Sequence, residues 1–181
     1  MRVRVWDGLV RMLHWTLAAA VATCLISGHW PPSHFDDWHH TAGYVAGAAV
    51  ALRLAWGFTG SRYARLAQFV RGPHAVLAYA RALRAGREPR HLGHNPLGGW
   101  MVLALWSTAA ALALTGWLYT TEWLWGYDWL SELHAWLAWG LIALVIGHLG
   151  GVAMTSWRHH ENLVGAMFSG RKRAPEADDI D

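Results

Sequence analysis

The stretch LHAWLAWGLIALVIGHLGG, residues 133–151, has no formally charged side chain but contains two histidines, His134 and His148, fourteen positions apart. An α-helix has about 3.6 residues per turn and rises about 1.5 Å per residue, so this interval is nearly four turns and about 21 Å. Both imidazoles would therefore lie on nearly one face, at two depths. About 20 apolar residues can cross a bilayer, where an ionisable side chain is a functional candidate. The structural alternative places His134 at the interface and lets His148 hydrogen-bond a neighbouring helix.

The composition predicts a membrane protein. Of 181 residues, 54% are hydrophobic and 14 are Trp, which is unusual for a soluble domain. Long apolar runs predict four membrane-spanning helices, over residues 9–28, 41–58, 96–119 and 133–157. The predicted fold is thus an all-α, integral-membrane four-helix bundle formed by one domain. That domain covers residues 1–170, and residues 171–181 form a basic, then acidic tail that we expect to be disordered.

The charge distribution predicts the orientation of the bundle. All 15 Lys and Arg residues lie near the N-terminus, between Arg53 and Arg90, or from Arg158 onward. By the positive-inside rule, both termini and the loop of residues 57–95 are cytoplasmic. The basic charge then favours contact with anionic lipid and gives no support for nucleic-acid binding. The two short connections face outward and have acidic residues instead of basic ones: Asp36, Asp37, Glu122, Asp128 and Glu132.

The cytoplasmic loop contains a predicted amphipathic helix. The segment HAVLAYARALRAG, residues 74–86, follows a Gly-Pro pair and has apolar side chains at helical spacing, with its arginines on the other side. Such a helix can lie on the membrane surface with its arginines facing lipid phosphates. A solvated linker helix is the alternative.

Given this orientation, the sequence predicts two pairs of histidines, and the two members of each pair lie at the same depth in the membrane on different helices. The outer pair is His134 with either His39 or His40, and the inner pair is His148 with His14. Two histidines at one depth on different helices are what bis-imidazole haem ligation needs, and helix bundles build cofactor sites from facing side chains. A structural zinc site would require four ligands, and neither depth has a Cys or a carboxylate inside the spans. A proton relay would not require two separated pairs.

Two arginines are candidates for the haem propionates. Arg53 follows His39 by fourteen residues, the same interval as between His134 and His148, and therefore lies near the depth of the inner pair. Its guanidinium could pair with a propionate, and Arg11 could do the same from the first helix. Snorkelling to lipid headgroups is the alternative for both.

Several segments, in order, resemble the prokaryotic cytochrome b561 family. They are VWDGLVRMLHW, HHTAGYVAGAAVALRLAWGFTGS, HLGHNPLGGWMVLAL, LHAWLAWGLIALVIGHLGGV and ENLVGAMFSGRK. The family includes the cytochrome b subunits of Ni,Fe-hydrogenases and is similar to the gamma subunit of formate dehydrogenase. The resemblance implies a multi-pass protein of the bacterial inner membrane with two haem b groups, which passes electrons between the quinone pool and a redox partner.

The resemblance also implies roles for individual residues. The iron ligands are His14, His39, His134 and His148, and the family pattern of a histidine, three residues and Gly-Tyr selects His39 over His40. The stretch Gly-His-Asn-Pro is similar to a part of related subunits that binds quinone, which makes His94 and Asn95 quinone-site candidates. Capping of the helix that begins at Pro96 is the structural alternative for these two residues.

Three classes of function follow from these expectations. The leading one is electron transfer to or from a basic periplasmic cytochrome c, met by the acidic outer loops, or a hydrogenase-like dehydrogenase. A second copy of the chain, in a homodimer, is a further candidate partner. The second class is an enzyme, a superoxide:quinone oxidoreductase that acts without a partner. The third is a metal or haem transporter.

Overall fold

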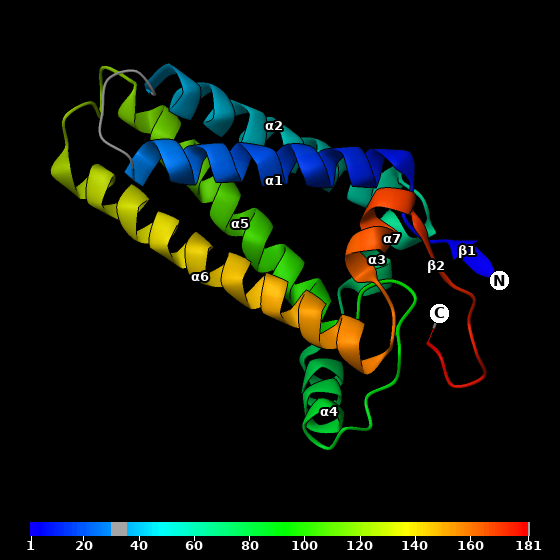
Figure 1. The fold of residues 1–181 in the computed structure, drawn as a ribbon. Coiled ribbons are helices and arrows are strands. Elements are labelled where there is room, and N and C mark those ends of the chain that lie inside the picture. Colours follow the sequence, from blue (N-terminus) through cyan, green and yellow to red (C-terminus); the bar gives the residue numbers. More distant parts are fainter. Residues whose placement is uncertain (30–35, 181) are drawn as a thin grey trace. The chain divides into compact units, whose positions relative to one another are not determined.

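The computed structural model describes residues 1–29 and 36–180, with the side chain of Asp36 also outside the description. Part of the predicted outer connection, residues 30–35, therefore lies outside the described residues. The architecture is helical, as predicted, with one small sheet. Its four long helices are α1 (Gly8–His29), α2 (Asp36–Thr59), α5 (Pro96–Tyr119) and α6 (Asp128–Arg158) (Figure 1).

Three of these helices are long and apolar enough to cross a membrane. Within the part of the chain that the structure describes, they are α1, α5 and α6. The helix α2 covers the predicted second span but is not among them. Its first turns, Asp-Asp-Trp-His-His, are polar, and Arg53 interrupts its apolar run. The helices α1, α5 and α6 thus have the length and hydropathy that the predicted membrane-spanning helices require.

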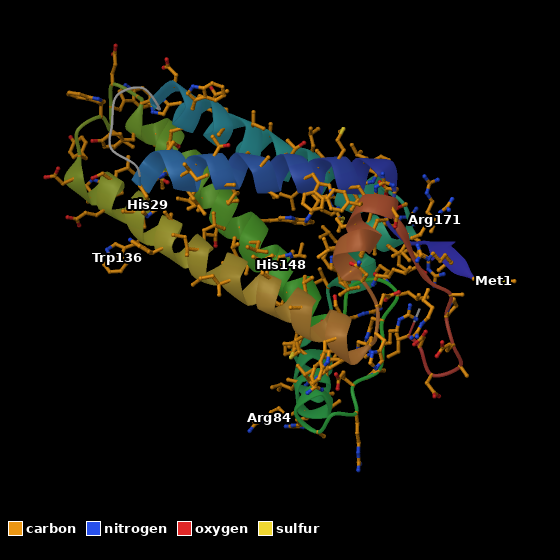
Figure 2. The ribbon with its side chains drawn as sticks, viewed as in Figure 1. Met1, His29, Arg84, Trp136, His148 and Arg171 are labelled. Atoms are coloured by element: carbon orange, nitrogen blue, oxygen red, sulfur yellow. The ribbon has the colours of Figure 1, made fainter. Side chains whose placement is uncertain are left out.

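Apolar side chains cover the outside of the long helices. Trp136 on α6, labelled in Figure 2, points away from the ribbon and is 74% exposed. Trp139, Ile146 and Leu149 on the same helix are also exposed. An exposed apolar surface of this extent is typical of a chain that is surrounded by lipid.

The chain forms two compact units. The first comprises residues 1–11, 55–103 and 146–181, and the second comprises residues 12–54 and 104–145. The second unit thus consists of one part of each long helix, together with the connections between them. In it, Ala20 of α1 packs against Ala42 and Ala46 of α2, and the small side chains allow the two helices to approach closely.

The first unit contains the short elements. Its core consists of Val5, Trp6, Val10, Ala64 and Ala166. Antiparallel pairing joins its two strands, in the register Arg2 with Arg173 and Arg4 with Arg171. These strands are an addition to the predicted all-α fold. The short elements are β1 (Arg2–Arg4), η1 (Arg62–Ala64), α3 (Leu66–Phe69), α4 (Pro73–Arg84), α7 (Leu163–Ser169) and β2 (Arg171–Arg173).

The helix predicted in the middle loop is α4. It begins at Pro73, whose ring suits the first turn of a helix. Tyr79 is buried, and burial raises the pKa of its hydroxyl to about 12. Arg81 and Arg84 are exposed, and Figure 2 shows Arg84 on this helix. The helix α4 thus has an apolar side and a basic side, as the sequence predicted for this segment.

A polar cap starts α1. The backbone N–H of Val10 donates to Oδ1 of Asp7 at 2.8 Å, and Oδ2 accepts from Trp56 Nε1 at 3.0 Å and from Ser61 Oγ at 2.5 Å. Burial by itself would raise the pKa of the Asp7 carboxyl, but these hydrogen bonds outweigh it and lower the pKa. The carboxylate at position 7 therefore fixes the first turn of α1 to the end of α2 within the first unit.

Ion pairs hold the tail for which the sequence predicts disorder. Arg90 pairs with Glu161 at 2.8 Å and also with Asp179 near the C-terminus. Ile180 N donates to the carbonyl of Arg90 at 2.8 Å. Lys172 on β2 is only 5% exposed, and its Nζ lies 3.9 Å from Glu161. These contacts connect β2 and the residues after it to the loop before α5.

We expect the Lys172→Met variant to be more stable than the wild type at pH 7. Burial lowers the pKa of Lys172 from 10.5 to about 8 in the folded protein, so between these values the unfolded chain binds more protons and stability rises with pH. At pH 7 Lys172 is charged in both the folded and the unfolded protein. Its burial then costs the most free energy, because a charged ammonium group is removed from water. Thermal unfolding should show a higher Tm for the variant at pH 7 and a smaller difference at pH 10. A lower Tm for the variant at pH 7 would contradict this.

Candidate functional site

The second unit encloses a cavity. Its volume is about 320 Å³, within the range of small-molecule and cofactor sites. The C-terminal halves of α1 and α5 and the N-terminal parts of α2 and α6 line it. Most of the lining is apolar or small, including Val21, Leu112 and Leu141. Two histidines, His39 and His134, are among the polar lining residues.

These two histidines face each other from different helices. The ring centroids of His39 on α2 and His134 on α6 are 6.1 Å apart, with the ring planes at 60°. Metal–imidazole bonds are about 2.0–2.1 Å long. A metal ion between two ring nitrogens therefore requires centroids roughly 6 Å apart, once the radius of each ring is added. The observed centroid separation of 6.1 Å is close to this value, and bis-imidazole ligation by this pair stays a prediction.

A hydroxyl lies beside the Nδ1 atom of each ring. Ser27 Oγ on α1 is 3.0 Å from His39 Nδ1, and Thr115 Oγ1 on α5 is 2.8 Å from His134 Nδ1. Because Nδ1 is engaged in this way, Nε2 is the nitrogen that would bind a metal in each ring. Metal-binding histidines commonly use their second ring nitrogen in such a hydrogen bond.

A glycine follows each hydroxyl residue and makes room for the ring. A Cβ on Gly28 would lie 3.3 Å from Cε1 of His39, and a Cβ on Gly116 would lie 3.3 Å from Cε1 of His134. Both distances are tighter than ordinary contacts, so alanine at either position would push the ring aside. Each histidine ring thus packs against an equivalent dipeptide on a neighbouring helix: Ser27-Gly28 for His39 and Thr115-Gly116 for His134.

Two further histidines line the cavity and are exposed. His40 has its ring centroid 6.3 Å from that of His39. His29 Nδ1 donates to the carbonyl of Leu25 at 2.9 Å, and its ring meets Trp139 edge-on at 5.2 Å. His29 was not predicted as a site residue, because it lies at the end of the first apolar run, where a histidine is expected to contact solvent. Ser27 and Thr115 were not predicted either, although a hydroxyl residue followed by Gly recurs near the C-terminal ends of α1 and α5.

The residues predicted for the inner pair belong to different units, and each is described in its own. In the second unit, His14 is half-buried with its ring edge-on to Trp15 at 5.1 Å. In the first unit, His148 is half-buried on α6. Their joint ligation of an iron therefore stays a prediction.

The two predicted propionate partners also have distinct surroundings. Arg53 is 5% exposed, and its guanidinium lies over the ring of Trp106 at 4.7 Å from the centroid. Stacking on an aromatic face stabilises a buried cation. Arg11 Nη1 donates to the carbonyl of Ser169 at 3.3 Å within the first unit.

The quinone-site candidates lie in the first unit. The ring of His94 is packed between Trp6 and Phe69, at centroid distances of 4.9 and 4.8 Å. Asn95 Oδ1 accepts from Gly98 N at 2.7 Å, which caps the start of α5. Asn95 thus has the helix-capping role of the alternative interpretation, and a quinone site at His94 and Asn95 stays a prediction.

The donor set of the cavity suits a haem better than a bare metal ion. Among residues 1–29 and 36–180, no group of three or more His, Cys, Asp or Glu side chains could hold a metal ion. Two imidazoles suffice for a haem iron, because its other four ligands come from the macrocycle.

Comparisons with known proteins agree with these features. A family model described as prokaryotic cytochrome b561 matches residues 5–170, a range that includes all four predicted iron ligands. A "Probable Ni/Fe-hydrogenase B-type cytochrome subunit" of Bradyrhizobium diazoefficiens is 20% identical over 220 aligned positions, which cover 94% of this chain and 86% of the relative. No solved structure matches the chain.

Proposed function

Because the chain belongs to the prokaryotic cytochrome b561 family, we propose that it is a di-haem b-type membrane cytochrome that transfers electrons between the quinone pool and a redox partner at the outer face. The observation that carries this proposal is the pair His39 and His134. These rings face each other at 6.1 Å beside a largely apolar cavity, with a hydroxyl at each Nδ1. A bound haem supplies one-electron exchange at its iron.

The residues of this chain hold and insulate the proposed outer haem. His39 and His134 would hold the haem iron, and Ser27 and Thr115 would orient the two imidazole rings through the contacts at Nδ1. The apolar lining excludes water and sets a low dielectric around the site, which tunes the reduction potential.

The inner haem is proposed to bind His14 and His148, with Arg53 and Arg11 as partners of its propionates. The fourteen-residue intervals and the family membership support this assignment. His94 and Asn95 are proposed to lie near the quinone. In the same proposal, α2 is the fourth membrane-spanning helix, both termini are cytoplasmic, and the membrane is the bacterial inner membrane.

Charge and exposure around the α5–α6 connection support the choice of partner. Glu122, Asp128 and Glu132 are exposed there, together with Trp123 and Trp125. An acidic surface with aromatic side chains favours a basic redox protein, because complementary charge speeds encounter. A basic cytochrome c meets this description, and the hydrogenase subunit among the relatives makes a hydrogenase-like enzyme the other candidate.

The haem content of the purified protein tests the proposal. We expect a dithionite-reduced minus oxidised spectrum of b type and, by pyridine haemochrome, two haems per chain. A quinol should reduce both haems in the membrane-embedded protein. One haem or none would contradict the di-haem assignment. Rapid reduction by superoxide in a stopped-flow experiment, followed by quinone-dependent reoxidation, would favour the superoxide:quinone oxidoreductase instead.

A further inference from the structure

We propose that Ser27-Gly28 and Thr115-Gly116 are positioning residues that fix the tautomer of His39 and His134 and thereby lower the reduction potential of the haem held between them. This inference rests on the proposed ligation of the outer haem by these two histidines. It adds a role for helices α1 and α5, which supply no ligand to that site.

The direction of the hydrogen bonds follows from where each hydroxyl proton goes. Ser27 Oγ donates to the carbonyl of Thr23 at 2.7 Å, one turn earlier on the same helix. Thr115 Oγ1 donates in the same way to the carbonyl of Ala111 at 2.8 Å. A hydroxyl has one proton and two acceptor lone pairs. Because each hydroxyl donates its proton to a carbonyl of its own helix, it accepts a hydrogen bond from the N–H group of the imidazole.

The imidazole must therefore carry its proton on Nδ1. In neutral histidine the other nitrogen, Nε2, then has a free lone pair and can bind a metal. The opposite arrangement, in which the hydroxyl donates to Nδ1, would place the proton on Nε2 and block ligation. The hydrogen bonds thus select the tautomer that a haem ligand needs, and they do so identically at His39 and His134.

Burial makes these hydrogen bonds effective. Thr115 is only 7% exposed, and Ser27, His39 and His134 are half-buried. In such a low-dielectric setting a hydrogen bond is electrostatically stronger than in water. The two glycines allow each ring to approach its hydroxyl closely. A Cβ at position 28 or 116 would lie 3.3 Å from the ring and would move the ring away from that hydroxyl.

The expected consequence is a lower potential. Donation from Nδ1–H makes the imidazole a more basic ligand, and a more basic ligand stabilises ferric over ferrous iron. The couple concerned is the one-electron reduction of ferric to ferrous haem, and no proton leaves either histidine. Removal of the hydroxyl should therefore raise the midpoint potential of the outer haem.

The test uses Thr115→Val and Ser27→Ala in the full-length, haem-loaded protein. For each we expect the ratio of reduced to oxidised outer haem at a fixed applied potential to rise, and a tenfold rise would correspond to a shift of about 59 mV for one electron. The outer haem is the component that disappears from the potentiometric titration of His134→Ala. Electron paramagnetic resonance of the oxidised protein gives a second readout, because the low-spin signal of the same haem should shift.

Two controls separate positioning from mere packing. Thr115→Ser keeps the hydroxyl and should retain the wild-type potential. Thr23→Val removes a hydroxyl that makes the same bond to its own helix, Thr23 Oγ1 to Ala19 O at 3.0 Å, one turn from Ser27. Thr23 does not line the cavity, and its variant should leave the potential unchanged.

The outcomes distinguish this inference from the proposed function. Two haems per chain with unchanged potential in both Thr115→Val and Ser27→Ala would overturn the inference and leave the haem assignment intact. Equal shifts in Thr23→Val would overturn it as well. Loss of the outer haem from Thr115→Val but not from Thr115→Ser would support it. Retention of both haems in His134→Ala would overturn the proposed function itself.

Discussion

The His39→Ala variant is expected to bind one haem b per chain instead of two, whereas His40→Ala is expected to retain both. Only His39 combines a ring that faces His134 at 6.1 Å with a hydroxyl, Ser27 Oγ, at its Nδ1. His40 is exposed, and one position along a helix turns a side chain by about 100°. Pyridine haemochrome analysis of the purified variants measures the difference directly.

A double variant sharpens this prediction. If His39 and His134 bind the same iron, His39→Ala/His134→Ala should lose no more haem than either single variant, because both substitutions abolish one site. His74→Ala removes an exposed histidine of α4 in the other unit and should keep two haems. Loss of haem from His40→Ala with full retention in His39→Ala would contradict the assignment. A double variant without any haem would show that the two histidines serve separate sites.

The second large effect is expected in the ion-pair cluster of the first unit, where Glu161→Gln should destabilise the folded state by about 3 kcal/mol. This is the lower end of the cost of breaking a buried ion pair, because Arg90 keeps its pair with Asp179. The Glu161 carboxylate accepts from Arg90 Nη2 at 2.8 Å and Nε at 3.2 Å, and from the backbone N–H of Arg173 at 2.9 Å. The two side chains are only 8% and 4% exposed. Removal of one charge leaves the buried guanidinium without its bidentate partner, and this costs more than loss of a surface pair.

Thermal unfolding and limited proteolysis of the C-terminal tail measure this loss. Glu176→Gln is the matched control, because Glu176 pairs with Arg173 at 3.5 Å while both side chains are largely exposed. Such a pair contributes about 0–1 kcal/mol, so the control should unfold like the wild type. An equal Tm for Glu161→Gln and Glu176→Gln would contradict a structural role for the buried cluster.

The pH dependence of the same variant gives an independent check. Burial by itself would raise the pKa of Glu161, but hydrogen bonds from Arg90 and Arg173 lower it below the usual 4.5. A lowered folded-state pKa contributes stability above the usual pKa, and this is lost as the pH falls through the folded-state value. The wild type should therefore lose its advantage over Glu161→Gln as the pH falls below about 4.5.

Much of the helical frame could be predicted from local sequence. Apolar runs locate α1, α5 and α6 because each run is long enough to cross a membrane by itself, whatever its neighbours do. The amphipathic α4 was predicted for the same reason, since its periodicity is local. The pairing of β1 with β2 could not be predicted, because three-residue strands about 170 positions apart have no local signal.

The sequence by itself determined that the chain is helical and apolar, because hydropathy and helical spacing are properties of contiguous residues. From the same spacing it predicted histidines in pairs at matching depths. It also determined the family, through several motifs in a fixed order. The family pattern already selected His39 over His40, but only the tertiary structure brought the His39 ring to 6.1 Å from that of His134. It alone also placed the hydroxyls of Ser27 and Thr115 beside the Nδ1 atoms of these two rings. These contacts join different helices, and the rotation of one helix about its axis is fixed only by what packs against it.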